Sequence, residues 1–455
     1  MDGSKQSQKR EQQKTNYSPQ KEKNKMKHFS ILTTLAVALA TLASCGNEPA
    51  MELCDDGSPG KTALPETKDQ ALVAKAVKAR DFFYPKGSRA SAAGVTVGHY
   101  VTNSSRSATD TVLSVVNFAD GRGFVILTDK ADSPEILAVS DEGTLSLENI
   151  DNPSLKLFVD NAIENLQGKA SGIVGGLDPT RPFLYKFENT YDTIYNVEPM
   201  IKVHWGQNAP YNNYCPMLPN NKRAYAGCVP IAAAQIMTHH LYPRSFVWDV
   251  EGGSTTVAVD WDMINRHITS GTDSIQTSCQ DYAATHNVIG MLVRKIGQEV
   301  GVIYRTFGSF TTMRSFKSGI SYFGYKTSDI KQFGTKPTAS FDGSRIWVVG
   351  GRDATSSGRD AGHMFLIDGR KYIRHDYKSY ILDPSITPPA LVEVVEEYTR
   401  YYDYVHINWG WDGTSNGYFY NGTYNSRNPY KLDYSSGGVA SYNFTSELEY
   451  VEVYL

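Results

Sequence analysis

The sequence has little of what specifies a metal site, a disulfide framework or a nucleic-acid-binding surface. Its 455 residues include five cysteines, at positions 45, 54, 215, 228 and 279, and no Cys-x-x-Cys pair. These cysteines are too scattered for a disulfide framework and give no zinc signature. The formal net charge is -3, and a mildly acidic chain gives no reason to expect nucleic acid as a partner. We therefore expect no metal, no cofactor and no bound nucleic acid.

No apolar run is long enough to predict a transmembrane span. Residues 26–45 have a basic start, a short apolar stretch and small residues at the end, which is typical of a secretory signal. The ending Leu42-Ala43-Ser44-Cys45 resembles a bacterial lipobox, whose cysteine is lipidated; an ordinary signal peptide cut at a small residue is the alternative. We expect an exported protein of the bacterial cell envelope, periplasmic or at the outer membrane, held to the membrane by a lipid on Cys45.

Composition divides the remaining chain into two folded units. Residues 1–25 are polar and charged and precede a better start at Met26, so we set them aside as untranslated or disordered. A polar tether follows at 46–66. The pattern of residues 67–167 predicts a helix, several strands and a second helix, and therefore a small α+β unit. The predicted elements are a helix over 68–83, strands over 112–118 and 123–128 joined by Asp120-Gly121, a strand over 136–140, and a helix capped by Asn152.

The second unit holds the residue types that carry chemistry. Residues 168–195 are rich in glycine, proline and small polar residues, which predicts an exposed linker with an activation cleavage region. All six tryptophans and most of the histidines lie after it. We therefore place the catalytic domain at 196–455.

One cysteine stands where a helix begins. Cys228 follows Gly227 and precedes a run of strong helix formers that ends at Met237. Pro230 is tolerated in a first helical turn, where its missing N–H costs nothing. We therefore expect Cys228 at a helix N-terminus, where free amides and the helix dipole lower the pKa of a thiol and make it nucleophilic. A buried structural cysteine is the alternative.

A cysteine nucleophile needs a base, which is usually distant in sequence. His363 stands at the head of a predicted short apolar strand ended by Asp368-Gly369, although a surface histidine would give the same pattern. Further on, alternation places His406 and Asn408 on one face of a strand and Trp409 on the other. Asn408 can accept the N–H of a histidine ring, as the third member of a Cys-His-Asn arrangement does.

Acyl transfer also needs hydrogen-bond donors for the oxyanion of its tetrahedral intermediate. Gln207 lies upstream of the cysteine, and its side-chain amide could serve together with the backbone N–H of Cys228. Without further context, a glutamine is more often merely a surface residue.

Four motifs in this order resemble the streptopain family of bacterial cysteine peptidases, peptidase family C10. They are His204-Trp205-Gly206-Gln207, the segment 224–237 around Cys228, the segment 362–369 around His363, and His406-Ile-Asn408-Trp409-Gly-Trp-Asp-Gly. Residues 117–128 and 134–137 are similar to the inhibitory propeptide of that family. The resemblance covers roughly residues 65–455 and departs from the family pattern at Pro230, Ile231 and Met364.

The resemblance implies an α+β fold with a papain-like peptidase domain preceded by a small α+β prodomain. It implies Cys228 as nucleophile, His363 as general base and acid, Gln207 as oxyanion donor, Asn408 as orienter of His363, and Trp409 as a shield over that pair. The expected function is a cysteine endopeptidase made as a latent zymogen, with polypeptide substrates and its own prodomain as inhibitor. A catalytically silent lipoprotein that binds host or cell-surface proteins through the same cleft, and an acyl-transferring enzyme, remain as alternatives.

Overall fold

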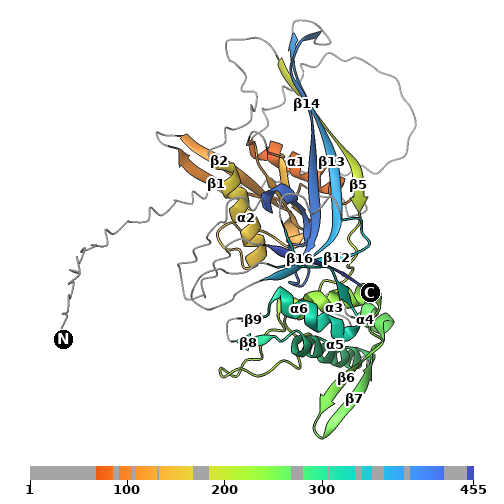
Figure 1. Cartoon of the computed structure of the whole chain (residues 1–455). Coiled ribbons are helices and arrows are strands. Elements are labelled where there is room, and N and C mark those ends of the chain that lie inside the picture. The colour runs from red at the N-terminus through yellow and green to blue at the C-terminus, as the bar shows by residue number, and fades with distance from the viewer. Residues whose placement is uncertain are drawn as a thin grey trace, which may run out of the picture.

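Figure 1 shows a computed structural model of the chain, which mixes helices and strands and confirms the predicted α+β class. The structure describes residues 68–85, 92–104, 108–130, 133–167, 184–267, 280–305, 308–333, 341–350, 363–383, 390–424 and 448–455. The predicted signal segment, its Cys45 and the tether at 46–66 lie outside the described residues. No helix in these ranges is both long and apolar enough to cross a membrane.

The N-terminal unit forms as its local signals predict. Helix α1 spans Lys68–Phe83 and strand β4 spans Ile136–Ser140, both with the expected limits. Strand β2 (Ala108–Asn117) and strand β3 (Phe124–Leu127) are joined through Asp120 and Gly121, whose φ values are 57° and 66°. These left-handed conformations are the ones that an Asp-Gly hairpin turn requires. The sequence missed strand β1, Thr96–Ser104, at the edge of this sheet.

Helix α2 (Pro153–Leu166) begins where the capping signal places it. The side-chain oxygen of Asn152 accepts hydrogen bonds from the backbone N–H groups of Ser154 and Leu155. This satisfies two of the amides that a helix start leaves free.

One sheet runs through both units. In the described part of the chain it has 12 strands, in the order β1-β2-β3-β4-β15-β14-β13-β12-β16-β10, with β5 paired to β13 and β11 to β16. The strands not yet located are β5 (Leu184–Val197), β10 (Lys326–Thr327), β11 (Lys331–Gln332), β12 (Ile346–Gly350), β13 (Met364–Asp383), β14 (Ala390–Asn408), β15 (Gly417–Tyr420) and β16 (Glu449–Tyr454). Strand β4 of the N-terminal unit pairs with β15, so the two units share backbone hydrogen bonds.

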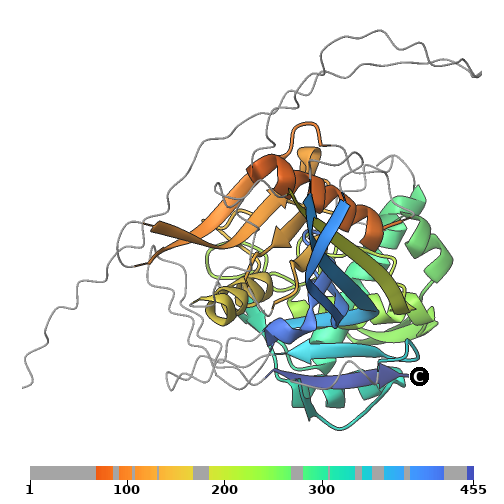
Figure 2. The same ribbon diagram turned by 90° about the horizontal axis from the view of Figure 1, so that it is seen from above.

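The remaining helices gather on one side of this sheet (Figure 1). They are α3 (Cys228–His240), α4 (Trp261–His267), α5 (Gln280–Glu299) and α6 (Met313–Ile320), accompanied by the hairpins β6–β7 (Ser245–Val250, Gly253–Ala258) and β8–β9 (Ile303–Arg305, Gly308–Phe310). The view from above shows the strands of the N-terminal unit beside the long strands β13 and β14 (Figure 2).

Strand β12 separates the two main cores. Ile346 and Val348 join the core built on α3, α5 and α6, whereas Trp347 and Val349 join the core shared with α2 and the N-terminal sheet. A strand buried on both faces is a continuous apolar run, as the burial of all five β12 residues illustrates.

One sequence expectation about chain organisation was wrong, and a strand falls within another predicted segment. Residues 184–195 of the predicted linker lie in β5, which pairs with the Arg370–Leu382 part of β13. The strand after His363 does not end at Asp368-Gly369 but continues through a register shift there and forms a long hairpin with β14. In both cases pairing with a distant strand overrides a local turn or loop signal.

Candidate active site

Cys228 is the first residue of α3, as predicted. The preceding Gly227 has a φ of 95°, and a Cβ at this position would lie 3.2 Å from the Cβ of Ser309. Glycine therefore meets two requirements at once, an unusual backbone conformation and a close approach. Pro230 lies in the first turn of α3, where its ring is compatible with the helix.

The thiol of Cys228 is buried against the strand that follows His363. Its Sγ accepts a hydrogen bond from the backbone N–H of Met364 at 3.4 Å, although the two residues are 136 positions apart. Burial raises the pKa of Cys228, and the amides of Met364, Val229 and Cys228 oppose this shift without reversing it. The expected lowering of the thiol pKa is therefore wrong for this form of the chain, because desolvation outweighs the helix-end amides.

His363 immediately precedes β13 and is also buried. Burial lowers its pKa to about 4, against the opposing effect of a hydrogen bond to the backbone of Trp409. Among the described residues, Nε2 of His363 has no hydrogen-bond partner. In both members of the candidate pair, burial thus favours the neutral form.

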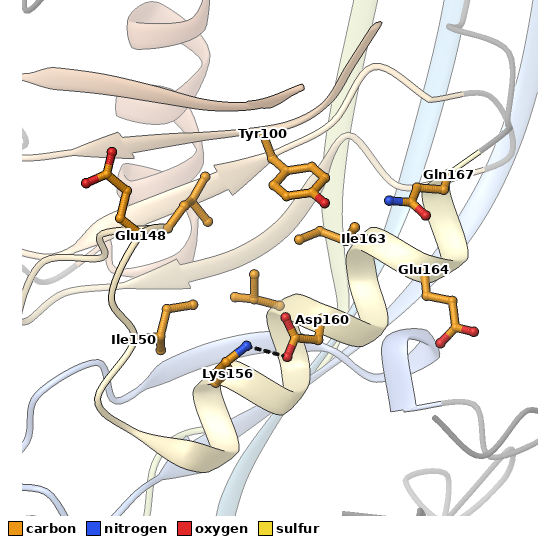
Figure 3. A pocket seen from close by; sticks show the side chains of 10 residues that line it. Tyr100, Glu148, Ile150, Lys156, Asp160, Ile163, Glu164 and Gln167 are labelled. Carbon is orange, nitrogen blue, oxygen red and sulfur yellow. Dashed lines mark hydrogen bonds and ion pairs between the residues drawn. The ribbon is translucent and has the colours of Figure 1, made fainter. Parts of the chain in front are cut away.

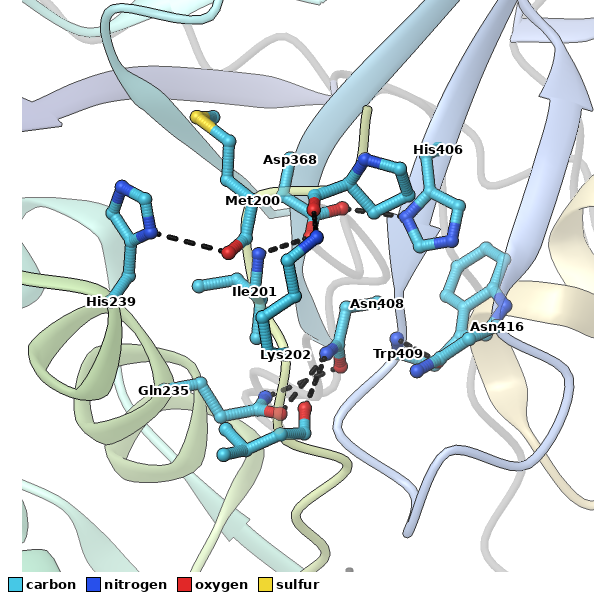
Figure 4. A network of polar contacts seen from close by, with 12 residues as sticks. Met200, Ile201, Lys202, Gln235, His239, Asp368, His406, Asn408, Trp409 and Asn416 are labelled. Carbon is cyan, nitrogen blue, oxygen red and sulfur yellow. Dashed lines mark hydrogen bonds and ion pairs between the residues drawn. The ribbon is translucent and has the colours of Figure 1, made fainter. Parts of the chain in front are cut away.

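Asn408 contacts a different partner from the expected one. Its side-chain amide pairs with that of Gln235 on α3, with Asn408 Nδ2 donating to Gln235 Oε1 at 3.0 Å and Gln235 Nε2 donating to Asn408 Oδ1 at 3.2 Å (Figure 4). The Asn408 oxygen also accepts from the backbone N–H of Gly410 at 3.0 Å. An amide oxygen with two donors has used both lone pairs, so the expected Asn408–His363 hydrogen bond does not form here.

Trp409 is fully buried but does not cover His363 with its ring. It packs on Phe365 and Phe419, and its indole N–H donates to the carbonyl of Ser415 at 2.9 Å. The tryptophan beside His363 is Trp411, whose ring centroid lies 6.4 Å from that of the imidazole. The predicted alternation of the strand is nevertheless confirmed, since Val405, Ile407 and Trp409 all enter the same core.

Gln207 lies near the nucleophile. Its backbone carbonyl accepts the N–H of Ala226 at 2.9 Å, two residues before Cys228. Its side chain is partly exposed, and its role as oxyanion donor stays a prediction.

Two buried polar residues escaped the sequence analysis. Asp368 is fully buried, and its carboxylate contacts Nδ1 of His406 at 2.7 Å and accepts the backbone N–H of Ile201 at 2.9 Å. Gln235 is fully buried within an otherwise apolar stretch of α3. A polar residue amid apolar helix formers is the signal that could have found Gln235, since buried polar groups are almost always hydrogen-bonded.

The N-terminal unit touches the loop that follows the Asn408 motif. Glu142 contacts Nδ1 of His204 at 3.0 Å, and this contact raises the pKa of His204. Ser140 donates to the carbonyl of Asn416 at 2.6 Å. The segment after β4 therefore lies against two of the four sequence motifs.

A separate pocket of about 420 Å³ lies within the N-terminal unit (Figure 3). Strand β1, α2 and the loop between β4 and α2 line it, with Tyr100, Ile150 and Ile163 among the apolar residues. None of the candidate catalytic residues contributes to it. In the described ranges no group of three or more His, Cys, Asp or Glu side chains could hold a metal ion.

Comparison with known proteins defines the class. Residues 205–419 match the model of the Peptidase C10 family. The chain is 24% identical over 351 residues to the thiol protease/hemagglutinin PrtT of Porphyromonas gingivalis, covering 71% of this chain and 35% of PrtT. It is 23% identical over 370 residues to streptopain of Streptococcus pyogenes, covering 72% of this chain and 77% of streptopain. The chain thus spans about a third of the length of PrtT.

Two solved structures are similar. A prointerpain A fragment from Prevotella intermedia has a TM-score of 0.45 and 20% identity, covering 78% of this chain and 98% of that one. Active interpain A has a TM-score of 0.34 and 22% identity, covering 57% and 95%. The protein is a cysteine peptidase. Its residues 205–419 match the peptidase C10 family, to which the four sequence motifs point as well.

Proposed function

We propose that the chain is a cysteine endopeptidase made as a latent zymogen, with Cys228 as nucleophile and His363 as general base and acid. The observation that carries the proposal is the contact of Cys228 Sγ with the backbone of Met364, because it brings the residue next to His363 onto the start of α3. A thiol at a helix start next to a histidine is the arrangement that thiol acyl transfer requires.

The reaction proceeds by acyl transfer. The Cys228 thiolate attacks a peptide carbonyl, and the Gln207 side-chain amide and the Cys228 backbone N–H stabilise the oxyanion. His363 then protonates the leaving amine, and water hydrolyses the thioester with His363 as base. Asn408 orients the His363 ring in the active form. For this cycle a ring nitrogen of His363 must lie beside Sγ, where each group favours the charged form of the other.

Latency follows from burial of both reacting groups. In the neutral state neither a thiolate nor an imidazolium is available, since burial raises the pKa of Cys228 and lowers that of His363. The N-terminal unit supports this state as a prodomain through the β4–β15 pairing and the contacts of Ser140 and Glu142. Cleavage between 168 and 195, with β5 as the C-terminal part of that region, then permits activation.

The exported and anchored form belongs to the same proposal. Residues 26–45 have the composition of a signal segment that ends in a lipobox-like cysteine, Cys45. Labelling of the protein with a radioactive fatty acid in the producing bacterium tests this part, and loss of the label in Cys45→Ser is the expected result.

Replacement of the nucleophile tests the enzymatic part. Cys228→Ala is expected to abolish both self-cleavage and hydrolysis of casein, because no other described group is placed to form the thioester. Cys215→Ala is the matched control, since Cys215 is a second buried free cysteine in the described ranges. N-terminal sequencing of the three proteins gives the processing site. Casein cleavage by purified Cys228→Ala would overturn the mechanism.

A further inference from the structure

Gln235 connects three of the four segments that carry the candidate catalytic residues. It lies on the nucleophile helix, two turns after Cys228, and its side chain is completely buried. Its Oε1 accepts the backbone N–H of Trp205 at 3.2 Å, in the motif that ends at Gln207. Its amide also pairs with that of Asn408 (Figure 4). One side chain therefore contacts the segment of the oxyanion donor and the proposed partner of the histidine.

Backbone hydrogen bonds determine the orientation of these two side-chain amides, that is, where the oxygen and the nitrogen of each one lie. Asn408 Nδ2 donates to the carbonyl of Val203 at 3.3 Å, and Asn408 Oδ1 accepts from the N–H of Gly410 at 3.0 Å. A carbonyl can only accept and a backbone N–H can only donate, so the Asn408 amide cannot be flipped without losing both bonds. The Trp205 N–H fixes the Gln235 amide in the same way.

We propose that Gln235 is the positioning residue of this active site. Its side-chain amide holds that of Asn408 in one fixed orientation through their two mutual hydrogen bonds, and it ties this amide to the segment of Gln207. The base, the oxyanion donor and the nucleophile are then set relative to one another by α3. The inference rests on the proposed roles of Cys228, His363 and Asn408.

The chemistry of the site points to positioning rather than to filling of space. Burying a polar side chain in an apolar helix is unfavourable unless its hydrogen bonds are all made. Methionine is of similar length and unbranched, and would pack at lower cost in a helix whose other buried side chains are largely apolar. A glutamine at this position therefore contributes its donor and its acceptors, and these are directed at Asn408 and Trp205.

Variants of the full-length chain test the inference. In Gln235→Met we expect kcat on a peptide substrate to fall about 10²-fold with little change in KM, because misplacing catalytic groups by about an ångström has an effect of this size. Protein that does not process itself is matured with immobilised wild-type enzyme, which is then removed. Thr238→Val is the matched control, since Thr238 is a buried polar residue of α3 whose hydroxyl contacts only the carbonyl of Gln235 among the hydrogen bonds described. We expect this control to lose stability without a comparable loss of kcat.

Gln235→Glu gives a readout that a packing role would not produce. The protonated carboxyl can donate to Asn408 Oδ1 and accept from Trp205, as the amide does, whereas the carboxylate lacks the donor. The ratio of its kcat/KM to that of the wild type should therefore rise as the pH falls. This variant also decides the question if Gln235→Met does not fold.

A double-mutant cycle with Asn408→Ala completes the test. If Gln235 acts through Asn408, the double variant Gln235→Met/Asn408→Ala should be hardly slower than Asn408→Ala alone. Additive losses, or a Gln235→Met enzyme as fast as Thr238→Val, would overturn the inference. The proposed function fails by a different result, namely a wild type without activity or an active Cys228→Ala.

Discussion

The two sides of the active site differ in how they are built. The Cys228 side is local: Gly227, Cys228 and the helix that follows are adjacent in sequence, and the helix begins where its residues predict. The His363 side is assembled from the start of β13, the end of β14 and the loop beyond it. The nucleophile is therefore held rigidly by its own segment, whereas the base and its partner depend on long-range contacts. A zymogen can rearrange a side held by long-range contacts, such as that of His363, with less disruption than a side built from one continuous segment, such as that of Cys228.

The largest expected effect comes from removing the base. His363→Ala should lower kcat/KM by about 10²–10⁴-fold, the usual contribution of a general acid-base group. His375→Ala is the control, because His375 is another buried histidine, which lies on β13 and stacks on Tyr191. Peptide hydrolysis after maturation with immobilised wild-type enzyme measures both. Equal losses in the two variants would show that the His363 side has no special chemical role.

Separate replacement of Trp409 and Trp411 by alanine distinguishes a structural role from a chemical role on the His363 side. In the Cys228→Ala background, Trp409→Ala should lower the free energy of unfolding by about 3–5 kcal/mol, because it empties a fully buried site. Trp411→Ala should cost less stability but change His363, whose ring it faces. Urea unfolding measures the first effect, and the pH dependence of activity in otherwise wild-type protein measures the second. If Trp411→Ala left the pH dependence unchanged, the indole would not tune His363.

The pH dependence of stability tests whether His363 is buried in its neutral form. Its pKa falls from an ordinary 6.5 to about 4 on folding. The unfolded chain therefore binds a proton that the folded chain does not, and stability should be fully present above 6.5 and decrease as the pH falls toward 4. The slope attributable to one such group is about 1.4 kcal/mol per pH unit.

Urea unfolding of Cys228→Ala and of Cys228→Ala/His363→Gln at several pH values isolates this slope. The double variant should be less sensitive to acid by the contribution of His363. Other groups, including His240 with a pKa lowered by burial to about 4, contribute equally to both proteins. Identical slopes would mean that His363 is already exposed in the zymogen, which would remove the contrast between the two sides.

The smallest effect is expected at the contact between the N-terminal unit and the motif of Gln207. Glu142 and His204 are both partly exposed, so Glu142→Gln should change the free energy of unfolding by less than about 1 kcal/mol. The pKa of His204 should nevertheless fall, because its hydrogen bond with the Glu142 carboxylate raises it. NMR titration of the histidines measures this shift. An unchanged His204 pKa would show that the contact does not persist in solution.

Local sequence signals predicted the N-terminal helices and the hairpin closely, because each carries its own cap or turn residues. Asn152 caps α2 through its side chain, and Asp120-Gly121 adopts the left-handed conformation that its hairpin needs. The same kind of signal failed at Asp368-Gly369, where a strong turn dipeptide lies inside a long strand. There the pairing of β13 with β5 and β14 provides more hydrogen bonds than a turn would.

The candidate site likewise has local features that the sequence predicted and long-range contacts that it did not. The sequence identified Cys228 and its helix, the strand face shared by His406 and Asn408, and the similarity to the peptidase C10 family. It could not predict that Asn408 pairs with Gln235 or that Trp411 faces His363, because these pairs join elements far apart in sequence. It also predicted a lowered thiol pKa for Cys228, whereas burial raises it.

The sequence by itself thus determined the elements, the residue types that acyl transfer needs and the start of the nucleophile helix, since these depend on local propensities and on side-chain chemistry. The tertiary structure alone decided which groups meet and whether they are charged. Hydrogen-bond partners and desolvation depend on what a distant segment places beside each group. In this chain burial raises the pKa of Cys228 and lowers that of His363, and Asn408 pairs with Gln235.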